Sequence, residues 1–378
     1  MSSRTGKKLF TPGPLCCSAE VKAAMMEDLG SRDQDFIACV KEIRDELLEV
    51  AGVSAKEFTA VPLQGSGTYC VEAVLQTTSP RTGARVLVLS NGAYGERMGK
   101  ACTCGGIEVR VEAFPETEPV PVAQVQRLLE QYGDTFTTVA LVHLETSSGV
   151  INPVEEVGRL VHRYCPRAAF FVDAMSSFGA VPLDLDAAGV DYLVSSANKC
   201  LEGVPGFSYA ICRTQHLLSC RGHSRVMSLD LVEQYLGLEK IGQFRFTPPT
   251  HAMLAFRVAL SQYREEGGLQ GRAARYRENQ RVLVEGMTRL GFRRLLAPQH
   301  AGYVITAFLF PPHPNFDFTT LHNKLAERDQ VIYPGKVTRA DCFRVGTIGR
   351  LFPADVRELL VCLEAVMREM ELPVPLPY

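Results

Sequence analysis

Apolar stretches and amphipathic helical patterns alternate along the first part of the chain. Short apolar runs such as Val86–Leu89, Thr138–Leu144 and Ala168–Val172 are typical of buried strands. Between such runs, Val122–Tyr132 and Val154–Tyr164 have apolar residues at helical spacing. This alternation predicts an α/β fold in which helices cover both faces of a mostly parallel sheet.

Two helices are predicted before this alternation begins. Ser18–Leu29 is amphipathic, with Ser18 as its N-cap and Gly30 as its stop. A polar stretch then leads into a second helical segment, Asp35–Ala51. Ahead of both, Leu9–Leu15 contains two prolines, which predict a rigid, extended segment.

The pattern changes in the last third of the chain. A long, charged amphipathic helix is predicted at Leu269–Leu290 and another helix at Pro353–Met370, with fewer strands between them, one of which is Val331–Tyr333. This pattern favours a smaller α+β domain packed on the first one. We therefore expect a large domain of residues 15–258 and a small domain made of residues 1–14 and 259–378.

The composition is that of an ordinary globular protein. Of 378 residues, 40 are Lys or Arg and 42 are Asp or Glu, which gives a formal net charge of −2. Because no basic excess is available to hold a nucleic-acid backbone, we expect no nucleic-acid partner. No uncharged apolar run reaches the roughly 18 residues of a membrane span, so we expect no membrane association.

The twelve cysteines lack both a metal-ligand spacing and the density of a disulfide-stapled secreted domain. Cys102 and Cys104 have no second pair to complete a metal site, and Cys16 and Cys17 are adjacent. We therefore expect mostly reduced cysteines, no metal site and a reducing compartment. Met1–Leu9 lacks the apolar core of a secretory signal, so the cytoplasm is the expected location, with a mitochondrial presequence as the open alternative.

A glycine-rich segment, Gln64–Tyr69, separates the short apolar run Phe58–Pro62 from the helix-like Tyr69–Leu75. Free N–H groups at a helix start, together with the helix dipole, favour a bound anion such as a phosphate. The hydroxyls of Ser66 and Thr68 add two donors. The segment matches neither a Walker loop nor a dinucleotide fingerprint. On this segment alone, an ordinary turn with a helix cap is the alternative.

Two ionisable residues follow predicted strands. Asp173 comes directly after Phe170–Val172, and Lys199 follows Tyr192–Val194 among small neutral residues and a Gly/Pro turn. A desolvated amine in such a setting is the kind that forms Schiff bases. Taken singly, Asp173 could be a helix cap and Lys199 a solvated loop residue. Ligands of such sheets bind at the carboxyl ends of strands, which makes both residues candidates for a site.

An anion cradle, a carboxylate and an amine are together what pyridoxal phosphate (PLP) requires. Ser66–Thr68 would anchor its phosphate, Asp173 would keep its pyridinium nitrogen protonated, and Lys199 would hold its aldehyde. Tyr94, near the end of another predicted strand, could stack on the ring, and Thr146 could bond the phenolic oxygen. The sequence therefore predicts a PLP enzyme.

A series of segments spans nearly the whole chain and resembles class V aminotransferases of PLP fold type I. They are Thr11–Pro14, Gly65–Thr68, Asn91–Arg97, Glu145–Gly149, Val172–Ser177, Ser196–Cys200, Gly203–Gly206, Arg245–Thr247 and Phe343–Gly346. Ala197–Cys200 followed by Gly203–Gly206 resembles the phosphonate-using branch of the family. The resemblance implies a seven-stranded-type, mostly parallel sheet in the large domain, a smaller α+β domain, and a homodimer with active sites at the interface.

The resemblance also implies a role for each site residue. Lys199 would be the Schiff-base lysine and proton shuttle, and Thr247 would reach the cofactor phosphate of the neighbouring subunit. Arg344 would bind the acidic group of the substrate, since its planar fork suits a carboxylate or phosphonate. The other implied cofactor contacts are Ser66, Gly67 and Thr68 at the phosphate, with Asn198 beside them, Tyr94 on the ring, Thr146 at the phenolic oxygen and Asp173 at the pyridinium nitrogen.

The implied reaction is a ping-pong amino transfer from 2-aminoethylphosphonate to pyruvate, which gives phosphonoacetaldehyde and L-alanine. The first alternative is an alanine–glyoxylate or serine–pyruvate type of aminotransferase. A PLP lyase or desulfurase is the second, although no cysteine has the setting of a mobile catalytic thiol. A non-catalytic paralogue is the third, against which the intact Lys199 and Asp173 argue. Arg32 and Pro248 depart from the family pattern, and Arg32 is either a substrate contact or a surface charge.

Overall fold

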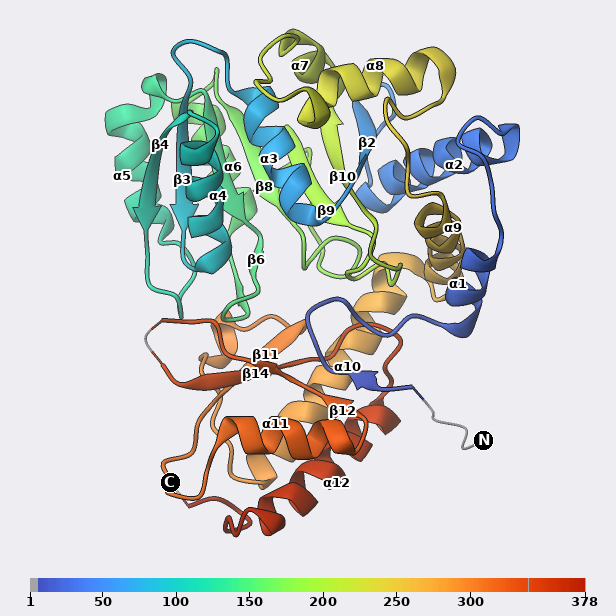
Figure 1. Cartoon of the computed structure of the whole chain (residues 1–378). Coiled ribbons are helices and arrows are strands. Elements are labelled where there is room, and N and C mark those ends of the chain that lie inside the picture. The colour runs from blue at the N-terminus through green and yellow to red at the C-terminus, as the bar shows by residue number, and fades with distance from the viewer. Residues whose placement is uncertain (1–5, 339, 378) are drawn as a thin grey trace.

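The chain folds into a larger and a smaller part (Figure 1), and each part has its own hydrophobic core. The computed structural model describes residues 6–338 and 340–377. The larger core gathers buried side chains between Leu15 and Tyr276 and three from later in the chain. The smaller core gathers Phe10 and side chains between Val282 and Leu376.

A seven-stranded sheet forms the centre of the larger part, in the order β2-β10-β9-β8-β5-β3-β4. The strands are β2 (Phe58–Gln64), β3 (Arg85–Ser90), β4 (Glu108–Ala113), β5 (Thr138–Val142), β8 (Ala169–Asp173), β9 (Tyr192–Ser196) and β10 (Phe207–Arg213). β10 is antiparallel to its neighbours β2 and β9, and all other pairs are parallel. The predicted α/β class with a mostly parallel sheet is confirmed.

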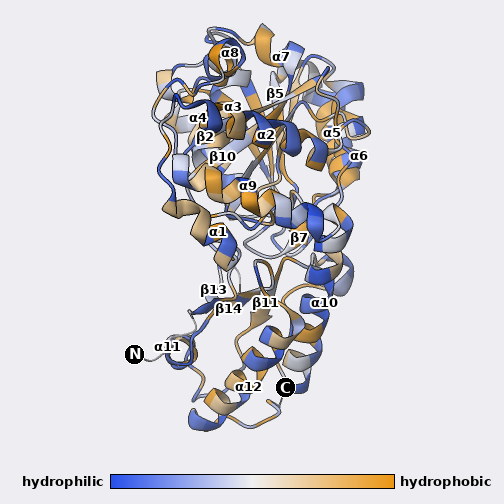
Figure 2. Ribbon diagram, turned by 90° about the vertical axis from the view of Figure 1, so that its right-hand side faces the viewer, coloured by the Kyte–Doolittle hydropathy of each residue, from blue (hydrophilic) through white to orange (hydrophobic). Residues whose placement is uncertain are grey.

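Helices cover both faces of this sheet. α3 (Gly67–Thr78) and α4 (Ala93–Cys104) lie on one face, and α5 (Val122–Tyr132) and α6 (Val154–Tyr164) on the other (Figures 1 and 2). All residues of β5, β8 and β9 are buried, as expected for strands covered on both sides. The remaining helices of this part are α1 (Ala19–Ala23), α2 (Gln34–Ala51), α7 (Thr214–Ser219), α8 (Leu231–Ile241) and α9 (Thr250–Glu265).

The smaller part is built on an antiparallel sheet in the order β11-β14-β13. Its strands are β11 (Ile305–Leu309), β13 (Tyr333–Pro334) and β14 (Cys342–Gly346), and its helices are α10 (Gly268–Arg289), α11 (Phe318–Glu327) and α12 (Pro353–Glu369). The N-terminal β1 (Lys8–Leu9) pairs in parallel with β12 (Gln330–Val331). Lys8 and Leu9 therefore belong with the last third of the chain.

The division expected from the sequence, into residues 15–258 on one side and residues 1–14 and 259–378 on the other, stays a prediction, since the larger core also includes Leu260 and Tyr263. One helix, α10, belongs to both parts. Tyr276, in its first half, lies in the larger core, while Val282 and Leu283 lie in the smaller one.

Two predicted elements differ from the structure. Ser18 caps a helix as expected, since its Oγ accepts a hydrogen bond from the N–H of Val21 at 3.1 Å. That helix ends at Ala23 and continues only as a 3₁₀ turn to Met26, because the backbone becomes extended at Glu27. The predicted strand at residues 331–333 is divided between β12 and β13, which pair with different partners. Helices α8 and α9 were not predicted.

All twelve cysteines are free thiols, which agrees with the expected reduced state. Among the described residues, no helix is both long and apolar enough to cross a lipid bilayer. The presequence alternative concerned Met1–Leu9, and residues 1–5 of that segment lie outside the described residues.

A buried polar network joins the loop after β9 to α10. The Oε1 atom of Glu202 accepts hydrogen bonds from the hydroxyl of Tyr276 and from Nη2 of Arg275, both at 2.6 Å. Arg272 is fully buried and donates to the carbonyl oxygen of Cys200. Since buried charges are costly unless they are paired, this network holds the backbone after Lys199 against the helix shared by both cores.

The Tyr276→Phe substitution tests this network. The hydroxyl of Tyr276 donates to Glu202 and accepts from the N–H of Gly349 at 3.1 Å, so its removal leaves two buried groups with one bond fewer. We expect the free energy of unfolding to fall by about 2 kcal/mol in urea denaturation. Tyr164→Phe removes an exposed hydroxyl bonded to Glu130 and should cost less than about 0.5 kcal/mol. Equal losses in the two variants would contradict the network's importance.

Candidate active site

The predicted site residues converge at the carboxyl ends of the central strands, on the side that faces the smaller part (Figure 1). Asp173 is the last residue of β8, and Lys199 lies in the loop that follows β9. Ser66 and Thr68 stand at the start of α3. Thr146 lies in the turn between the short strands β6 (Leu144–Glu145) and β7 (Val150–Ile151), which follow β5.

Lys199 is largely buried, and its amine is held by a backbone carbonyl. Its Nζ donates a hydrogen bond to the carbonyl oxygen of Pro12 at 2.8 Å. Burial lowers the pKa of Lys199 to about 8, because desolvation disfavours the charged form. Gly13 has φ +111°, and a Cβ there would lie 2.7 Å from Nζ. The N-terminal segment therefore crosses the lysine at a position that only glycine fits.

Asp173 is buried, with 4% of its surface exposed, and it interacts electrostatically with Lys199. Its Oδ1 accepts a hydrogen bond from the N–H of Met175 at 2.9 Å. Burial raises the pKa of Asp173 to about 6, although the bond from Met175 acts in the opposite direction. A cationic partner at this carboxylate would favour its ionised form.

The segment at the start of α3 has the features expected of an anion cradle. Ser66 is the N-cap residue but makes no side-chain hydrogen bond to the helix, which leaves its hydroxyl available. The hydroxyl of Thr68 accepts a hydrogen bond from Nη1 of Arg97 at 3.4 Å. Gly67 is buried, and a Cβ there would lie 2.2 Å from Cε of Met175. Glycine at this position therefore leaves room for the side chain of Met175, which follows Asp173.

Tyr94 lies in the first turn of α4 with cations near its ring. Nζ of Lys336 is 4.2 Å and Cζ of Arg97 is 4.8 Å from the ring centroid. The backbone N–H of Tyr94 donates to Oε2 of Glu145 at 3.2 Å. Burial raises the pKa of the Tyr94 hydroxyl. The ring is thus held at the site by contacts on both its backbone and its side chain.

Arg344 brings the smaller part of the chain to the same place. It lies on β14, is 5% exposed, and donates from Nη1 to the carbonyl oxygen of Thr146 at 2.8 Å and from Nε to that of Pro334 at 2.9 Å. The Thr146 hydroxyl is 2.7 Å from that of Ser176. Arg344 and Thr146 are therefore neighbours, although they are far apart in the sequence.

Two further predicted site residues, Asn198 and Thr247, have other surroundings than the residues described so far. Asn198 is half-buried, and its Oδ1 accepts a hydrogen bond from the Ser196 hydroxyl at 3.0 Å. Thr247 is exposed and lines a separate hollow with Gly65 and Tyr69, next to the cradle. Within this single chain Thr247 does not join the cluster around Lys199. Arg32 is exposed in the turn before α2.

Sequence reasoning missed four groups that shape the site: the carbonyl of Pro12, the hydroxyl of Ser176, and the side chains of Glu145 and Lys336. Glu145 is fully buried, and burial raises its pKa. Its Oε1 accepts hydrogen bonds from the N–H and hydroxyl of Ser147 at 3.0 and 2.6 Å. Three of the four stand in segments that carried the family resemblance. Lys336 stands in none, so no sequence signal pointed to it.

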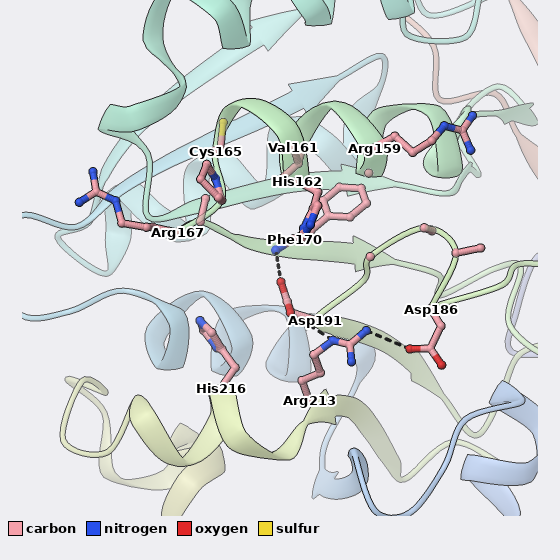
Figure 3. A pocket seen from close by; sticks show the side chains of 16 residues that line it. Arg159, Val161, His162, Cys165, Arg167, Phe170, Asp186, Asp191, Arg213 and His216 are labelled. Atoms are coloured by element: carbon pink, nitrogen blue, oxygen red, sulfur yellow. Dashed lines mark hydrogen bonds and ion pairs between the residues drawn. The ribbon is translucent and has the colours of Figure 1, made fainter.

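A second hollow lies at the opposite, amino end of the strands (Figure 3). Its lining includes Asp191, Arg213 and His216. Asp191 accepts a hydrogen bond from the N–H of Phe170 at 2.8 Å, and Arg213 pairs with Asp186 at 2.9 Å. None of the predicted site residues lines this hollow, so it is separate from the candidate active site.

The chain belongs to the class V aminotransferases. The sequence profile described as "Aminotransferase class-V" matches residues 17–331, which is most of the chain. Membership of this family implies PLP as the cofactor. The chemistry of the converging residues fits that cofactor, because it combines a buried amine of lowered pKa, a buried carboxylate and an open helix start.

Two relatives identify the branch of the family that the chain resembles. A 2-aminoethylphosphonate–pyruvate transaminase from Klebsiella pneumoniae is 46% identical over 361 residues, which cover 95% of this chain and 97% of the relative. A protein of the same name from Phocaeicola vulgatus is 45% identical over 363 residues and is covered to 99%. The resemblance to the phosphonate-using branch is confirmed.

Solved structures confirm the PLP fold type I. An alanine–glyoxylate aminotransferase from Nostoc has a TM-score of 0.86 at 26% identity, with 96% of each chain covered. A ureidoglycine–glyoxylate aminotransferase from Bacillus subtilis has a TM-score of 0.87 at 22% identity, with 97% of this chain and 94% of the other covered. At such identities the likeness concerns the fold.

The lowered pKa of Lys199 predicts how the protein takes up PLP. Only a neutral amine attacks an aldehyde, so the uptake rate should rise with pH and level off above about pH 8. An ordinary lysine would keep gaining neutral amine up to about pH 10.4. The rate is measured on cofactor-free protein from the visible absorption of the bound cofactor, with Lys199→Ala as the control that should lack this band. A rate that still climbs steeply above pH 10 would contradict the lowered pKa.

Proposed function

We propose that this protein transfers the amino group of 2-aminoethylphosphonate to pyruvate and forms phosphonoacetaldehyde and L-alanine. The observation that carries the proposal is the convergence of three residues on one site: Lys199 from the loop after β9, Asp173 from β8 and Arg344 from β14. The choice of substrates is supported by relatives of that name at 45–46% identity over 95% of the chain.

The cofactor would be held at its two ends by different elements. Ser66, Gly67 and Thr68 would bind its phosphate through hydroxyls and the N–H groups at the start of α3, with Asn198 nearby. Asp173 would face its ring nitrogen, where a positive charge matches a carboxylate. When bound, PLP supplies an electron sink for the carbon that carries the amino group.

Two uncharged side chains would orient the cofactor ring between these ends. Tyr94 would stack on the ring, and Thr146 would bond its phenolic oxygen. The Thr146 hydroxyl is already positioned by Ser176 at 2.7 Å. Because Arg344 bonds the carbonyl of Thr146, the residue that meets the substrate and the residue that meets the ring are fixed relative to each other.

Lys199 would move the proton in this reaction. Its pKa of about 8 leaves a useful fraction of neutral amine near neutral pH, which a solvated lysine lacks. The neutral amine removes the proton from the substrate carbon that carries the amino group. The carbonyl of Pro12 offers a position in which the protonated amine is stabilised. A general base needs both the right pKa and a fixed position, and Lys199 has both.

Arg344 would bind the acidic group of each substrate in turn. 2-Aminoethylphosphonate carries a phosphonate and pyruvate a carboxylate, and both are compact oxyanions. The bonds from Nε and Nη1 to carbonyl oxygens fix the plane of the guanidinium while leaving other N–H groups for a ligand. Fixed donors of this kind bind oxyanions more strongly than mobile ones.

The structure disfavours the desulfurase alternative. The cysteine adjacent to Lys199 is Cys200, which is fully buried and donates a hydrogen bond from Sγ to the carbonyl of Ser176 at 3.3 Å. Burial raises the pKa of its thiol to about 12, so it is not a ready nucleophile. A mobile catalytic thiol would need the opposite setting.

The substrate test compares amino donors on the PLP-loaded protein. With pyruvate as acceptor, 2-aminoethylphosphonate should give equimolar phosphonoacetaldehyde and alanine. Alanine and serine with glyoxylate, assayed side by side, should have kcat/KM values at least about 100-fold lower, equal to about 2.7 kcal/mol. A higher value for either pair would favour the alanine–glyoxylate or serine–pyruvate alternative. No turnover of any pair by loaded protein would favour the non-catalytic paralogue.

The second part of the proposal is a homodimer with active sites at its interface, in a reducing compartment such as the cytoplasm. Thr247 would then contact the phosphate at the partner's site. Tyr69 and Phe246 line the same hollow as Thr247 and are 54% and 42% exposed in the single chain. Exposed aromatic side chains that gather in this way mark a contact surface.

Phe246→Asp tests the dimer. A charge in the centre of the interface should shift the sedimentation coefficient of the PLP-loaded protein from that of a dimer toward that of a monomer at micromolar concentration, and lower activity in parallel. Val361→Asp places the same charge on α12 at a residue that is 69% exposed, and it should leave the dimer intact. A wild-type protein that sediments as a monomer would refute this part while leaving the substrate test unaffected.

A further inference from the structure

Three cationic side chains, Arg97, Lys336 and Arg344, lie together at the candidate active site. The family resemblance assigns a role to only one of them, Arg344. Lys336 and Arg97 lie 4.2 and 4.8 Å from the ring centroid of Tyr94, measured from Nζ and Cζ respectively. Arg344 interacts electrostatically with Tyr94 as well. Burial lowers the pKa of Lys336, and the nearby charges of Arg97 and Arg344 lower it further.

Within the described residues, none of these three cations forms an ion pair with a carboxylate. Arg344 donates to backbone carbonyls and Arg97 to the hydroxyl of Thr68. Glu145 is the acidic residue whose charge acts on the pKa of Lys336. Its carboxylate oxygens already accept hydrogen bonds from the N–H groups of Ser147 and Tyr94. The positive charges of these three side chains are therefore available to bind an anion.

The three cations divide between two ends of the site. Arg97 bonds Thr68 at the start of α3, which places it at the cradle proposed for the cofactor phosphate. Lys336 and Arg344 both come from the smaller part of the chain. Lys336 follows β13, whose Tyr333 is paired with Arg344 on β14. They form a cationic pair on the side proposed for the substrate, whereas Arg97 stands alone at the cradle.

The loop that carries Lys336 is fixed to the larger part of the chain. The N–H and the hydroxyl of Thr338 both donate to Oε2 of Glu116 at 2.9 Å. This bond is made across the two parts, since Glu116 follows β4. It holds the loop in place two residues beyond Lys336, so the ammonium position does not depend on the Tyr94 ring alone.

The remaining donors of Arg344 explain why a second cation is useful. Of its five N–H groups, one on Nε and one on Nη1 are used by carbonyl oxygens. Besides these carbonyls, Arg344 has a side-chain hydrogen bond to Tyr94. The remaining N–H groups on Nη1 and Nη2 can meet two oxygens in one plane, which satisfies a carboxylate. A phosphonate is tetrahedral, has a third oxygen outside that plane, and carries up to two negative charges.

We propose that Lys336 is a specificity-determining residue that binds the third oxygen of a phosphonate and thereby favours the phosphonate donor over carboxylate substrates. The ammonium is a point charge on a flexible stem, so it can leave the Tyr94 ring and reach an oxygen out of the guanidinium plane. A carboxylate offers no such oxygen. This inference rests on the proposed function, because it assigns one part of the selectivity for 2-aminoethylphosphonate.

The test compares matched ligands in binding and in turnover. Ethylphosphonate and propionate differ in the acidic group and lack the amine, so their binding to the PLP-loaded protein reports recognition without reaction. In Lys336→Met, titration calorimetry should show a loss of affinity of about 10-fold or more for ethylphosphonate and less than about 3-fold for propionate. The kcat/KM for 2-aminoethylphosphonate should fall about 10- to 100-fold, and that for pyruvate much less.

Three further variants sharpen the comparison. Lys336→Arg keeps the charge and should restore most of the preference for the phosphonate. Arg344→Gln should weaken both ligands, since both are proposed to use its free donors. Lys56→Met removes an exposed lysine in the turn before β2 and should change neither affinity.

Equal losses for ethylphosphonate and propionate in Lys336→Met, or no loss for either, would overturn the assignment. Both outcomes differ from a failure of the proposed function. In that case the wild-type protein itself would not convert 2-aminoethylphosphonate, which is established before any variant is compared.

Discussion

The structure of the site depends on one buried amine whose hydrogen-bond acceptor is a neutral carbonyl. A carboxylate bonded directly to Lys199 would favour its charged form, whereas the carbonyl of Pro12 solvates the proton without fixing it there. Burial can then lower the pKa of the amine to about 8. Pro12 lies on the N-terminal segment, whose preceding residues pair with β12 in the smaller part. The chemistry of the lysine is therefore set by a segment nearly two hundred residues away in the sequence.

The rest of the site is arranged around that amine in layers. Asp173 and the loop carrying Lys199 come from adjacent strands, and their positions follow from the pairing of β8 with β9. Arg272 and Tyr276 of α10 hold the backbone just beyond the lysine. Arg344 reaches across from the smaller sheet to the carbonyl of Thr146. Lys199 is thus supported by residues that would not touch cofactor or substrate, which keeps the reacting amine in place.

Much of the fold could be predicted because its core strands are continuous apolar runs separated by helical patterns. Helices α5 and α6 match their predicted bounds, Val122–Tyr132 and Val154–Tyr164. Helices α8 and α9 went unrecognised. Nearly every residue of β2, β5, β8 and β9 is buried, so an apolar run in the sequence is enough to predict each of these strands. The local sequence pattern does not predict strand bounds that are set by the pairing partner. Residues 331–333, for example, divide between β12, which pairs with β1, and β13, which pairs with β14.

The site was predictable to the extent that its residues have distinctive chemistry at strand ends. Asp173, Lys199 and the Ser66–Thr68 segment were found in this way, and the structure brings them together. Side-chain geometry was not predictable, and the roles of Asn198 and Thr247 stay predictions. The carbonyl of Pro12 carries no side-chain signal at all. Lys336 is an isolated lysine in a loop, and only the pairing of β13 with β14 brings it to Tyr94.

The position of helix α10 in both cores limits how the two parts of the chain can be exchanged between proteins. Its 22 residues extend about 33 Å at about 1.5 Å per residue, and its two halves are built into different cores. A break just before α10 would therefore strip Tyr276 from the larger core. The smaller part is not an exchangeable module that recombination could lift from one enzyme to another. New substrate preferences are more readily acquired by replacing single side chains on the loops around β13 and β14, while the continuous helix keeps both halves in register.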